Sequence, residues 1–246
     1  MSAAIVTKSG TSSPFLLLGD HAGREVPPEL AQLGLAEADL ARHIGWDIGV
    51  FGLGQRLAQT LGATFISQRY SRLVIDCNRD PMRADAIPEI SDGTVVPGNH
   101  AIGEHERSAR IASVFKPYHD RISAELDARA ARGTPTIVVA LHSFTPMMQG
   151  FQRPWQFGVL HLSGSAFSDA MLVRLRAEAD RPEVGDNEPY SMDGIDFTVP
   201  HHAIGRGLDY VELEVRQDLV ADDAGRRAIA ERLTRILPAA LGDTRL

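Results

Sequence analysis

The sequence has only one cysteine, Cys77, among its 246 residues. A single cysteine can form neither an internal disulfide nor a cysteine-rich zinc site. The first residues also lack the basic start and apolar core of a secretory signal peptide. Together these absences predict a protein of the reducing cytoplasm, in which any metal ion would be held by histidine, aspartate and glutamate.

Long apolar runs and clusters of positive charge are missing as well. No apolar stretch approaches the ~20 residues that a membrane-spanning helix needs, so we expect no membrane partner. The formal net charge is −7 and the 25 lysines and arginines are dispersed, which argues against a nucleic-acid partner. The Gly-x-Ser-x-Gly, Gly-x-Gly-x-x-Gly and P-loop patterns are also absent, which argues against a serine-hydrolase elbow and the common nucleotide-binding loops.

The patterns that are present predict an α/β fold. Strand-like and helical segments alternate without a linker, which is typical of one domain spanning residues 1–246, a three-layer α/β/α sandwich with a mixed, mostly parallel sheet. Residues 1–13 are expected to be frayed, and 80–100 to form a loop that serves as a rim or lid. Strands are predicted at 15–18, 63–67, 73–77, 136–141, 157–162 and 210–216, and helices in two patterns between 30 and 61 (the second at 46–61), at 103–131 with a break at Pro117, at 165–179 and at 222–237.

Polar residues lie at the ends of several predicted strands. His21 and His142 each follow an apolar strand, and Glu214 lies near the end of another. Ligands bind at the carboxyl ends of the strands in open α/β sheets, so we expect these side chains to converge. Imidazoles and carboxylates suit Zn²⁺. A single histidine is more often a hydrogen-bonded, partly buried residue than a ligand, but two histidines at strand ends favour a metal site. A zinc site needs at least one more ligand, for which the candidates are Asp47, Glu25 and Asp76.

The last predicted strand has one polar face. Glu212, Glu214 and Arg216 alternate with Val211, Leu213 and Val215. If the polar face is exposed, this is an ordinary edge strand. If the face points to a metal ion, Glu214 can take a proton from water and pass it to a leaving amine.

The segment 72–81 combines an apolar core with charged residues. Arg72 and Arg79 have planar guanidinium groups that suit a ligand carboxylate, and Asp76 could orient one of them from behind. Pro81 then ends any further strand pairing because it has no backbone N–H. The alternative interpretation is a surface salt-bridge cluster at a strand end.

Six motifs, in this order, resemble the N-formylglutamate amidohydrolase family over nearly the whole chain. They are Asp20-His21-Ala22-Gly23, Trp46-Asp47-Ile48-Gly49, Ser71-Arg72 to Asn78-Arg79, Leu141-His142-Ser143-Phe144, Gly185-Asp186-Asn187-Glu188-Pro189-Tyr190 and Glu214-Val215-Arg216-Gln217-Asp218-Leu219.

A more distant resemblance is to zinc carboxypeptidases and aspartoacylase, and it implies a fold of that phosphorylase/hydrolase-like class. Arg72, Asp76, Asn78 and Arg79 are similar to their substrate-carboxylate motif, His142 to their later zinc histidine, and Glu214 to their catalytic glutamate. Those enzymes have a glutamate three residues after the first histidine, where this chain has Arg24. Glu25 is one residue out of register, so we prefer Asp47 as the remaining ligand.

We therefore predict a zinc-dependent amidohydrolase that removes a small acyl group, preferably formyl, from an amino acid such as N-formylglutamate. The alternatives are another N-acyl amino acid or carboxypeptidase-like hydrolase and, because of Arg24, a metal-free protein that binds small acids. Whether the protein forms a homo-oligomer stays open. The predicted roles are zinc ligands for His21, Asp47 and His142, general base and then acid for Glu214, substrate contacts for Arg72, Asn78, Arg79 and Arg216, and support of an arginine for Asp76. Arg216 could instead pair with Glu214 or with a cross-strand carboxylate.

Overall fold

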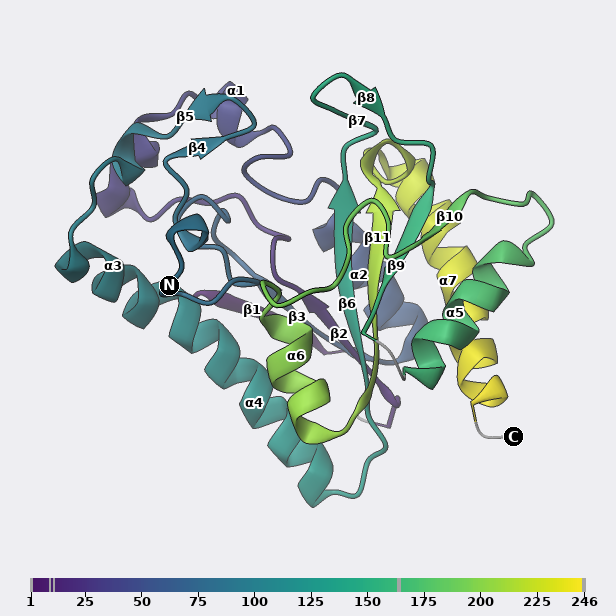
Figure 1. Ribbon diagram of the computed structural model, residues 1–246. Coiled ribbons are helices and arrows are strands. Elements are labelled where there is room, and N and C mark those ends of the chain that lie inside the picture. The colour runs from purple at the N-terminus through teal and green to yellow at the C-terminus, as the bar shows by residue number, and fades with distance from the viewer. Residues whose placement is uncertain (1, 9, 11, 163–164, 245–246) are drawn as a thin grey trace.

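The computed structural model describes residues 2–8, 10, 12–162 and 165–244. It contains a seven-stranded sheet between two layers of helices (Figure 1). The strand order is β1-β3-β2-β6-β11-β9-β10. The bounds are β1 Ala4–Lys8, β2 Phe15–Gly19, β3 Thr64–Gln68, β6 Ile137–Phe144, β9 Phe157–Leu160, β10 Val184–Asp186 and β11 Asp209–Arg216.

The sheet is mixed and mostly parallel, as predicted. Strands β3, β2, β6 and β11 run parallel to one another, and β9 is parallel to β10. Among the described pairings of this sheet, β1 with β3 and β9 with β11 are the antiparallel ones. The carboxyl ends of β2, β6 and β11 therefore meet at one edge of the sheet.

The two helical layers bury opposite faces of the same strands. Along β2, Phe15 and Leu17 pack into one apolar core, and Leu16 and Leu18 pack into the other. A strand buried on both faces needs a continuous apolar run, which is what this segment has. One layer is formed by α2 (Val50–Leu61), α5 (Ala166–Arg176) and α7 (Asp223–Asp243), and the other by α4 (Lys116–Ala131) and α6 (Thr198–His202) (Figure 1).

The predicted break at Pro117 corresponds to a change of helix type. Helix α3 (Glu104–Arg110) continues into a π-helical turn at Ile111–Phe115, and α4 begins at Lys116. A proline has no backbone N–H to donate, so a change in the hydrogen-bond pattern is expected at this place.

Among the described residues, no helix combines the length and the apolar character that crossing a membrane requires.

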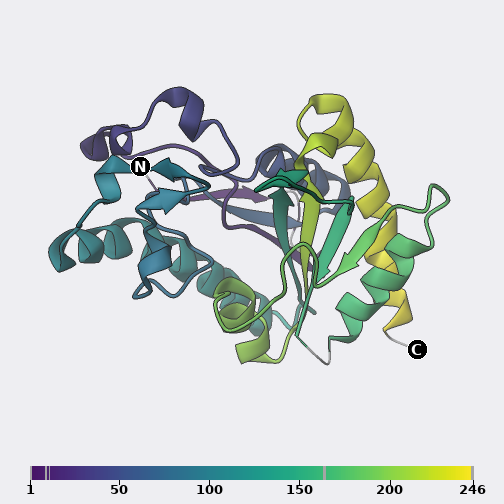
Figure 2. The same ribbon diagram turned by 45° about the horizontal axis from the view of Figure 1, so that its top comes forward.

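Two small hairpins lie above the carboxyl edge of the sheet, as the turned view in Figure 2 also shows. Strands β4 (Ile90–Ser91) and β5 (Thr94–Val95) form one, and β7 (Met147–Met148) and β8 (Phe151–Gln152) form the other. The first hairpin belongs to the 80–100 loop, which contributes Asp85, Pro88, Ser91 and Asp92 to the lining of the main cavity. The loop is therefore part of the rim, and its role as a lid stays a prediction.

The strand predicted at 73–77 is absent, and that prediction was wrong. The segment is buried but forms turns, with the Val74 N–H bonded to the Ser71 carbonyl (2.9 Å). Its own carbonyls are satisfied by side chains: Asn99 Nδ2 donates to Leu73 (2.9 Å) and Arg110 Nη1 donates to Val74 (3.0 Å). An apolar, β-branched run indicates burial, but burial does not require a neighbouring strand.

Further differences from the prediction concern the first strand and the start of α2. Ala4–Lys8 is an edge strand paired with β3 rather than a frayed end, while residues 1, 9 and 11 of that stretch lie outside the described residues. Helix α2 begins at Val50, not at residue 46, so Asp47 precedes the helix. The reason is tertiary, because the Asp47 N–H donates to the His21 carbonyl (2.8 Å) and its carboxylate accepts from the Ser143 N–H (3.2 Å).

Candidate metal centre and active site

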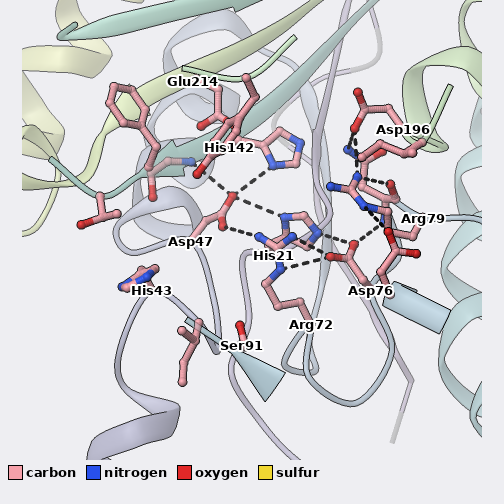
Figure 3. Close-up of a pocket in the computed structure, with 18 of the residues that line it drawn as sticks. His21, His43, Asp47, Arg72, Asp76, Arg79, Ser91, His142, Asp196 and Glu214 are labelled. Atoms are coloured by element: carbon pink, nitrogen blue, oxygen red, sulfur yellow. Dashed lines mark hydrogen bonds and ion pairs between the residues drawn. The ribbon is translucent and has the colours of Figure 1, made fainter. Parts of the chain in front are cut away.

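A cavity of about 480 Å³ opens at the carboxyl edge of the sheet. His21 follows β2, His142 lies in β6, and Glu214 lies in β11, so three neighbouring strands supply the floor of the cavity. Asp47 comes from the loop before α2. Figure 3 shows Asp47 between His21 and His142, with Glu214 on one side and Arg79 on the other. The convergence predicted from the strand ends is present.

His21, Asp47 and His142 form a possible metal site. One ligand atom of each residue lies within 4.8 Å of the others, and all three side chains are buried. Asp47 Oδ2 lies 3.0 Å from His142 Nδ1 and 3.5 Å from His21 Nδ1. Burial alone would raise the pKa of the Asp47 carboxyl, but His21 and His142 hold that pKa below its usual range. The carboxylate is therefore ionised, as a metal ligand must be.

The outer nitrogens of both histidines contact carboxylates. His21 Nε2 lies 2.7 Å from Asp76 Oδ1, and His142 Nε2 lies 3.4 Å from Asp20 Oδ2. Such carboxylates fix the ring orientation of metal-binding histidines in many metalloproteins. His21 Nδ1, on the inner side of its ring, is buried without a hydrogen-bond partner in the structure. Two inner imidazole nitrogens and an ionised carboxylate are a donor set that fits Zn²⁺.

Strand β11 lies between β6 and β9, so it is not an edge strand. Glu212 and Glu214 are 2% and 5% exposed. Glu214 lies opposite His142 on one neighbouring strand and opposite Gly158 on the other. Burial raises the pKa of Glu214 to about 7 and that of Glu212 to about 8. A carboxyl group with a pKa near neutrality can both accept and donate a proton.

The segment 72–79 forms the opposite wall of the cavity. Asp76 contacts both His21 and Arg72, whose Nη2 donates to Asp76 Oδ2 (2.6 Å). Arg72 Nη1 also lies 3.5 Å from Asp47 Oδ1. Arg72 is therefore bonded to or close to carboxylates of the possible metal site, and Asp76 contacts one of the two arginines that it was expected to orient.

Arg79 and Asn78 lie further out and share one partner. Both donate to Asp196 Oδ1, Arg79 Nη1 at 3.0 Å and Asn78 Nδ2 at 3.2 Å. Asp196 comes from the loop before α6, and burial raises its pKa even though Arg79 opposes this shift. The polar contacts of the Arg79 guanidinium with the described residues involve Nη1 and Nε. Its Nη2 can therefore donate to a ligand carboxylate.

Arg216 does not line the cavity, unlike the other predicted substrate-binding residues. Its guanidinium donates to Asp218 (Nε to Oδ1, 2.8 Å) and to the carbonyls of Pro154 and Trp155. It therefore forms an ion pair, but with a residue two positions along the chain rather than with Glu214. Glu25, one of the ligand candidates, bonds Arg69 at the surface (3.1 Å).

Four cavity or supporting residues were not among the predicted site residues. Glu212 could have been found, because it shares a strand face with Glu214 two residues away. Asp20 and Tyr190 lie within two of the motifs that resemble the family but were given no role there, and Asp196 has no comparable signal. Asp20 is buried and accepts from Tyr118 Oη (2.7 Å) and Thr198 Oγ1 (3.0 Å), contacts that depend on the tertiary fold.

Known proteins resemble this chain in sequence and in structure. A family model described as N-formylglutamate amidohydrolase matches residues 13–221. Two curated relatives, the N-formylglutamate deformylases of Pseudomonas putida and Pseudomonas aeruginosa, are 28% and 26% identical over 124 and 177 residues. These alignments cover 46% and 67% of this chain, and 45% and 65% of the two relatives, so the chain matches about half to two thirds of their length.

Two solved structures share the fold over the whole chain. A gene product from Agrobacterium tumefaciens is 36% identical, covers 100% of this chain and 97% of its own, and has a TM-score of 0.96. An N-formylglutamate amidohydrolase from Ralstonia eutropha is 18% identical, with coverages of 100% and 99% and a TM-score of 0.65. Since the family model spans most of the sequence, the chain belongs to the N-formylglutamate amidohydrolase family.

Proposed function

We propose that this protein is a zinc-dependent amidohydrolase that removes a formyl group, or another small acyl group, from the nitrogen of an amino acid such as N-formylglutamate. The observation that most supports this function is the convergence of His21, Asp47 and His142 beside the buried carboxyl group of Glu214. Family membership supports the same reaction class. The wall with Arg79 supports an amino-acid substrate, because it offers a cation for a carboxylate.

His21, Asp47 and His142 would hold the metal ion, with Asp76 and Asp20 fixing the two imidazole rings. A zinc ion in this site would supply Lewis-acid polarisation of the acyl oxygen and would lower the pKa of water to about 7. Asp20, Asp47 and Asp76 surround the two histidines, and their pKa values are held below the usual range, so that three ionised carboxylates are available to favour a divalent cation.

Glu214 acts on the protons of the reaction. As the oxygen of a water molecule attacks the acyl carbon, Glu214 takes one proton from that water. It then gives this proton to the amino-acid nitrogen as the carbon–nitrogen bond breaks. The second proton of the water stays on the acid product and is released when that acid ionises to formate. A pKa of about 7 suits both halves of this cycle.

The substrate carboxylate lies at the other wall. Arg79 pairs with it through the donors that Asp196 leaves free, and Asn78 donates beside it. Arg72 strengthens the positive potential there while remaining bonded to Asp76. We propose no substrate contact for Arg216, because its guanidinium is bonded to Asp218.

The test of the function is zinc analysis of the purified protein together with a panel of N-formyl, N-acetyl and peptide substrates. We expect stoichiometric zinc and fastest hydrolysis of an N-formyl amino acid. A preference for N-acetyl amino acids or for peptides would favour the related hydrolases. A protein that takes up no zinc even after reconstitution, yet binds amino acids, would be a metal-free binding protein.

Replacing Arg79 by alanine tests the carboxylate contact. A hydrogen bond to a charged group contributes about 1.5–3 kcal/mol, so the KM for a carboxylate substrate should rise roughly 10- to 100-fold with a smaller change in kcat. The matched control is Arg83→Ala, since Arg83 is bonded to Asp85 on the rim and does not line the cavity. If R79A still discriminated between a substrate and its carboxamide as the unaltered protein does, Arg79 would not be the contact.

A further inference from the structure

Arg153 is a buried cation without a carboxylate partner among the described residues. It is 7% exposed, and its recorded polar contacts run from Nη1 to the Tyr190 hydroxyl (3.0 Å) and to the Thr145 carbonyl (3.4 Å). Two comparably buried arginines differ from it, because Arg110 pairs with Glu106 and Arg129 lies beside Glu125. Burying a charge without a counter-ion is costly, so Arg153 indicates that negative charge arrives nearby during function.

The contact between Arg153 and Tyr190 has a fixed direction. A guanidinium group can only donate, so the phenol oxygen accepts this hydrogen bond. The hydrogen of the Tyr190 hydroxyl is therefore left for another acceptor, and no acceptor for it is found in the described part of the chain. The Arg153 guanidinium also stacks on the Tyr190 ring, 4.7 Å from its centroid, which restricts the orientation of the ring. Tyr190 lines the same cavity as Glu214 and His142.

Two glycines bring the chain before Tyr190 close to the catalytic glutamate. Gly158 of β9 and Gly185 of β10 are partners in the sheet, and Gly158 is also the partner of Glu214. A Cβ atom would lie 2.1 Å from the Glu188 carbonyl oxygen at Gly158 and 2.5 Å from it at Gly185. Only residues without a side chain allow the backbone of Glu188 to cross these strands so closely. The close contact of Glu188 with these two strands therefore fixes the chain just before Tyr190 near Glu214.

A negatively charged acyl oxygen needs a donor in this part of the cavity. Glu214 is an acid, Arg72 is bonded to Asp76, and Arg216 is bonded to Asp218. Arg79 is assigned to the substrate carboxylate at the other wall. Burial and the nearby Glu214 raise the pKa of Tyr190, so the phenol keeps its proton at neutral pH. A hydroxyl group that accepts a bond from a cation becomes a stronger donor itself.

We propose that the Tyr190 hydroxyl is a further catalytic group, which donates a hydrogen bond to the acyl oxygen of the substrate as negative charge develops there, and that Arg153 is its positioning residue. This inference rests on the proposed hydrolytic function. No covalent bond is made or broken by either residue, since their contribution is electrostatic.

The test is Tyr190→Phe, which removes the hydroxyl and keeps the ring. Loss of one oxyanion donor lowers kcat by about 10²–10³-fold, so we expect a loss of that size with KM changed little. Tyr70→Phe is the matched control, because Tyr70 is buried outside the cavity and should leave kcat unchanged. Arg153→Lys should retain more activity than Arg153→Met, which removes the cation. If Arg153 had a purely structural role, the Lys and Met variants would have the same activity whenever their thermal stabilities were equal.

Binding provides a readout that does not depend on turnover. In calorimetry, Y190F should weaken the affinity for a tetrahedral phosphonamidate analogue and leave the affinity for the free amino acid unchanged. An unchanged kcat and analogue affinity, or a change in KM alone, would overturn the proposal. If the unaltered protein hydrolyses no substrate of the panel, the proposed hydrolytic function fails. The analogue measurement then decides separately whether Tyr190 binds an oxyanion.

Discussion

Glu214→Gln should lower kcat by about 10²–10⁴-fold, the range that a general base contributes, and should leave zinc content unchanged. The substitution keeps the size of the side chain and a polar group, but an amide cannot take a proton from water. Glu214 is 5% exposed and lies opposite His142 in the sheet, so a polar side chain of equal length should fit without disturbing the metal ligands. Rates with an N-formyl amino acid and zinc per chain are the two measurements.

The informative comparison is Glu212→Gln. Glu212 lies on the same strand face, is as deeply buried, and has its Oε1 3.8 Å from His142 Nε2, on the side of that ring away from Asp47. Its loss should therefore affect the reaction much less than loss of Glu214. Equal losses in E212Q and E214Q would mean that the two carboxyl groups act as one unit. Normal turnover in E214Q would remove Glu214 from the mechanism altogether.

Asp47→Ala should lose most of the bound zinc and, with it, the hydrolytic activity. Even supporting carboxylates behind metal-binding histidines change affinity by about 10- to 100-fold, so removing a direct ligand should cost at least that much. Among the described residues, Asp47 is the carboxylate that forms the possible metal site together with His21 and His142. Zinc retained after dialysis against graded concentrations of a chelator measures the loss.

Glu25→Ala is the control for this experiment. Glu25 stands next to the position where the carboxypeptidase-like pattern has its glutamate ligand, but here it bonds Arg69 and is about half exposed. We expect E25A to retain zinc as the unaltered protein does. Zinc loss in E25A with full retention in D47A would reverse the ligand assignment and would require the 20–27 loop to rearrange around the metal.

The architecture could be predicted largely from local patterns. The buried run at Phe15–Gly19 and the alternation in Asp209–Arg216 contain enough information to place strands β2 and β11. The turns at 71–78 could not be predicted, because their backbone carbonyls are bonded by Asn99 and Arg110, far along the chain. A hydrophobic pattern indicates burial. In this buried segment, side chains and not a neighbouring strand form the hydrogen bonds to the backbone carbonyls.

Site residues at strand ends or in motifs could be predicted. The direction in which a long side chain points could not. Both histidines and Glu214 lie together as the strand-end argument predicts, and Asp47, which was preferred because it lies in a family-like motif, lies beside them. Alternation also places Arg216 on the face of Glu214, yet its long side chain bends to Asp218 at the end of the strand. Asp196 and Tyr190 come from an irregular loop, whose path over Gly158 and Gly185 is a tertiary property.

The cavity draws its two walls from different kinds of structure. The side chains proposed to transfer protons and bind metal are fixed largely by the central sheet, whereas the wall proposed to bind the substrate carboxylate is built from turns joined to α3 and to the loop before α6. Changes in those outer segments can therefore alter which amino acid is accepted while the hydrolytic centre stays intact. Such a division makes this scaffold well suited to diverging in substrate choice, or to being re-engineered for it, without rebuilding its chemistry.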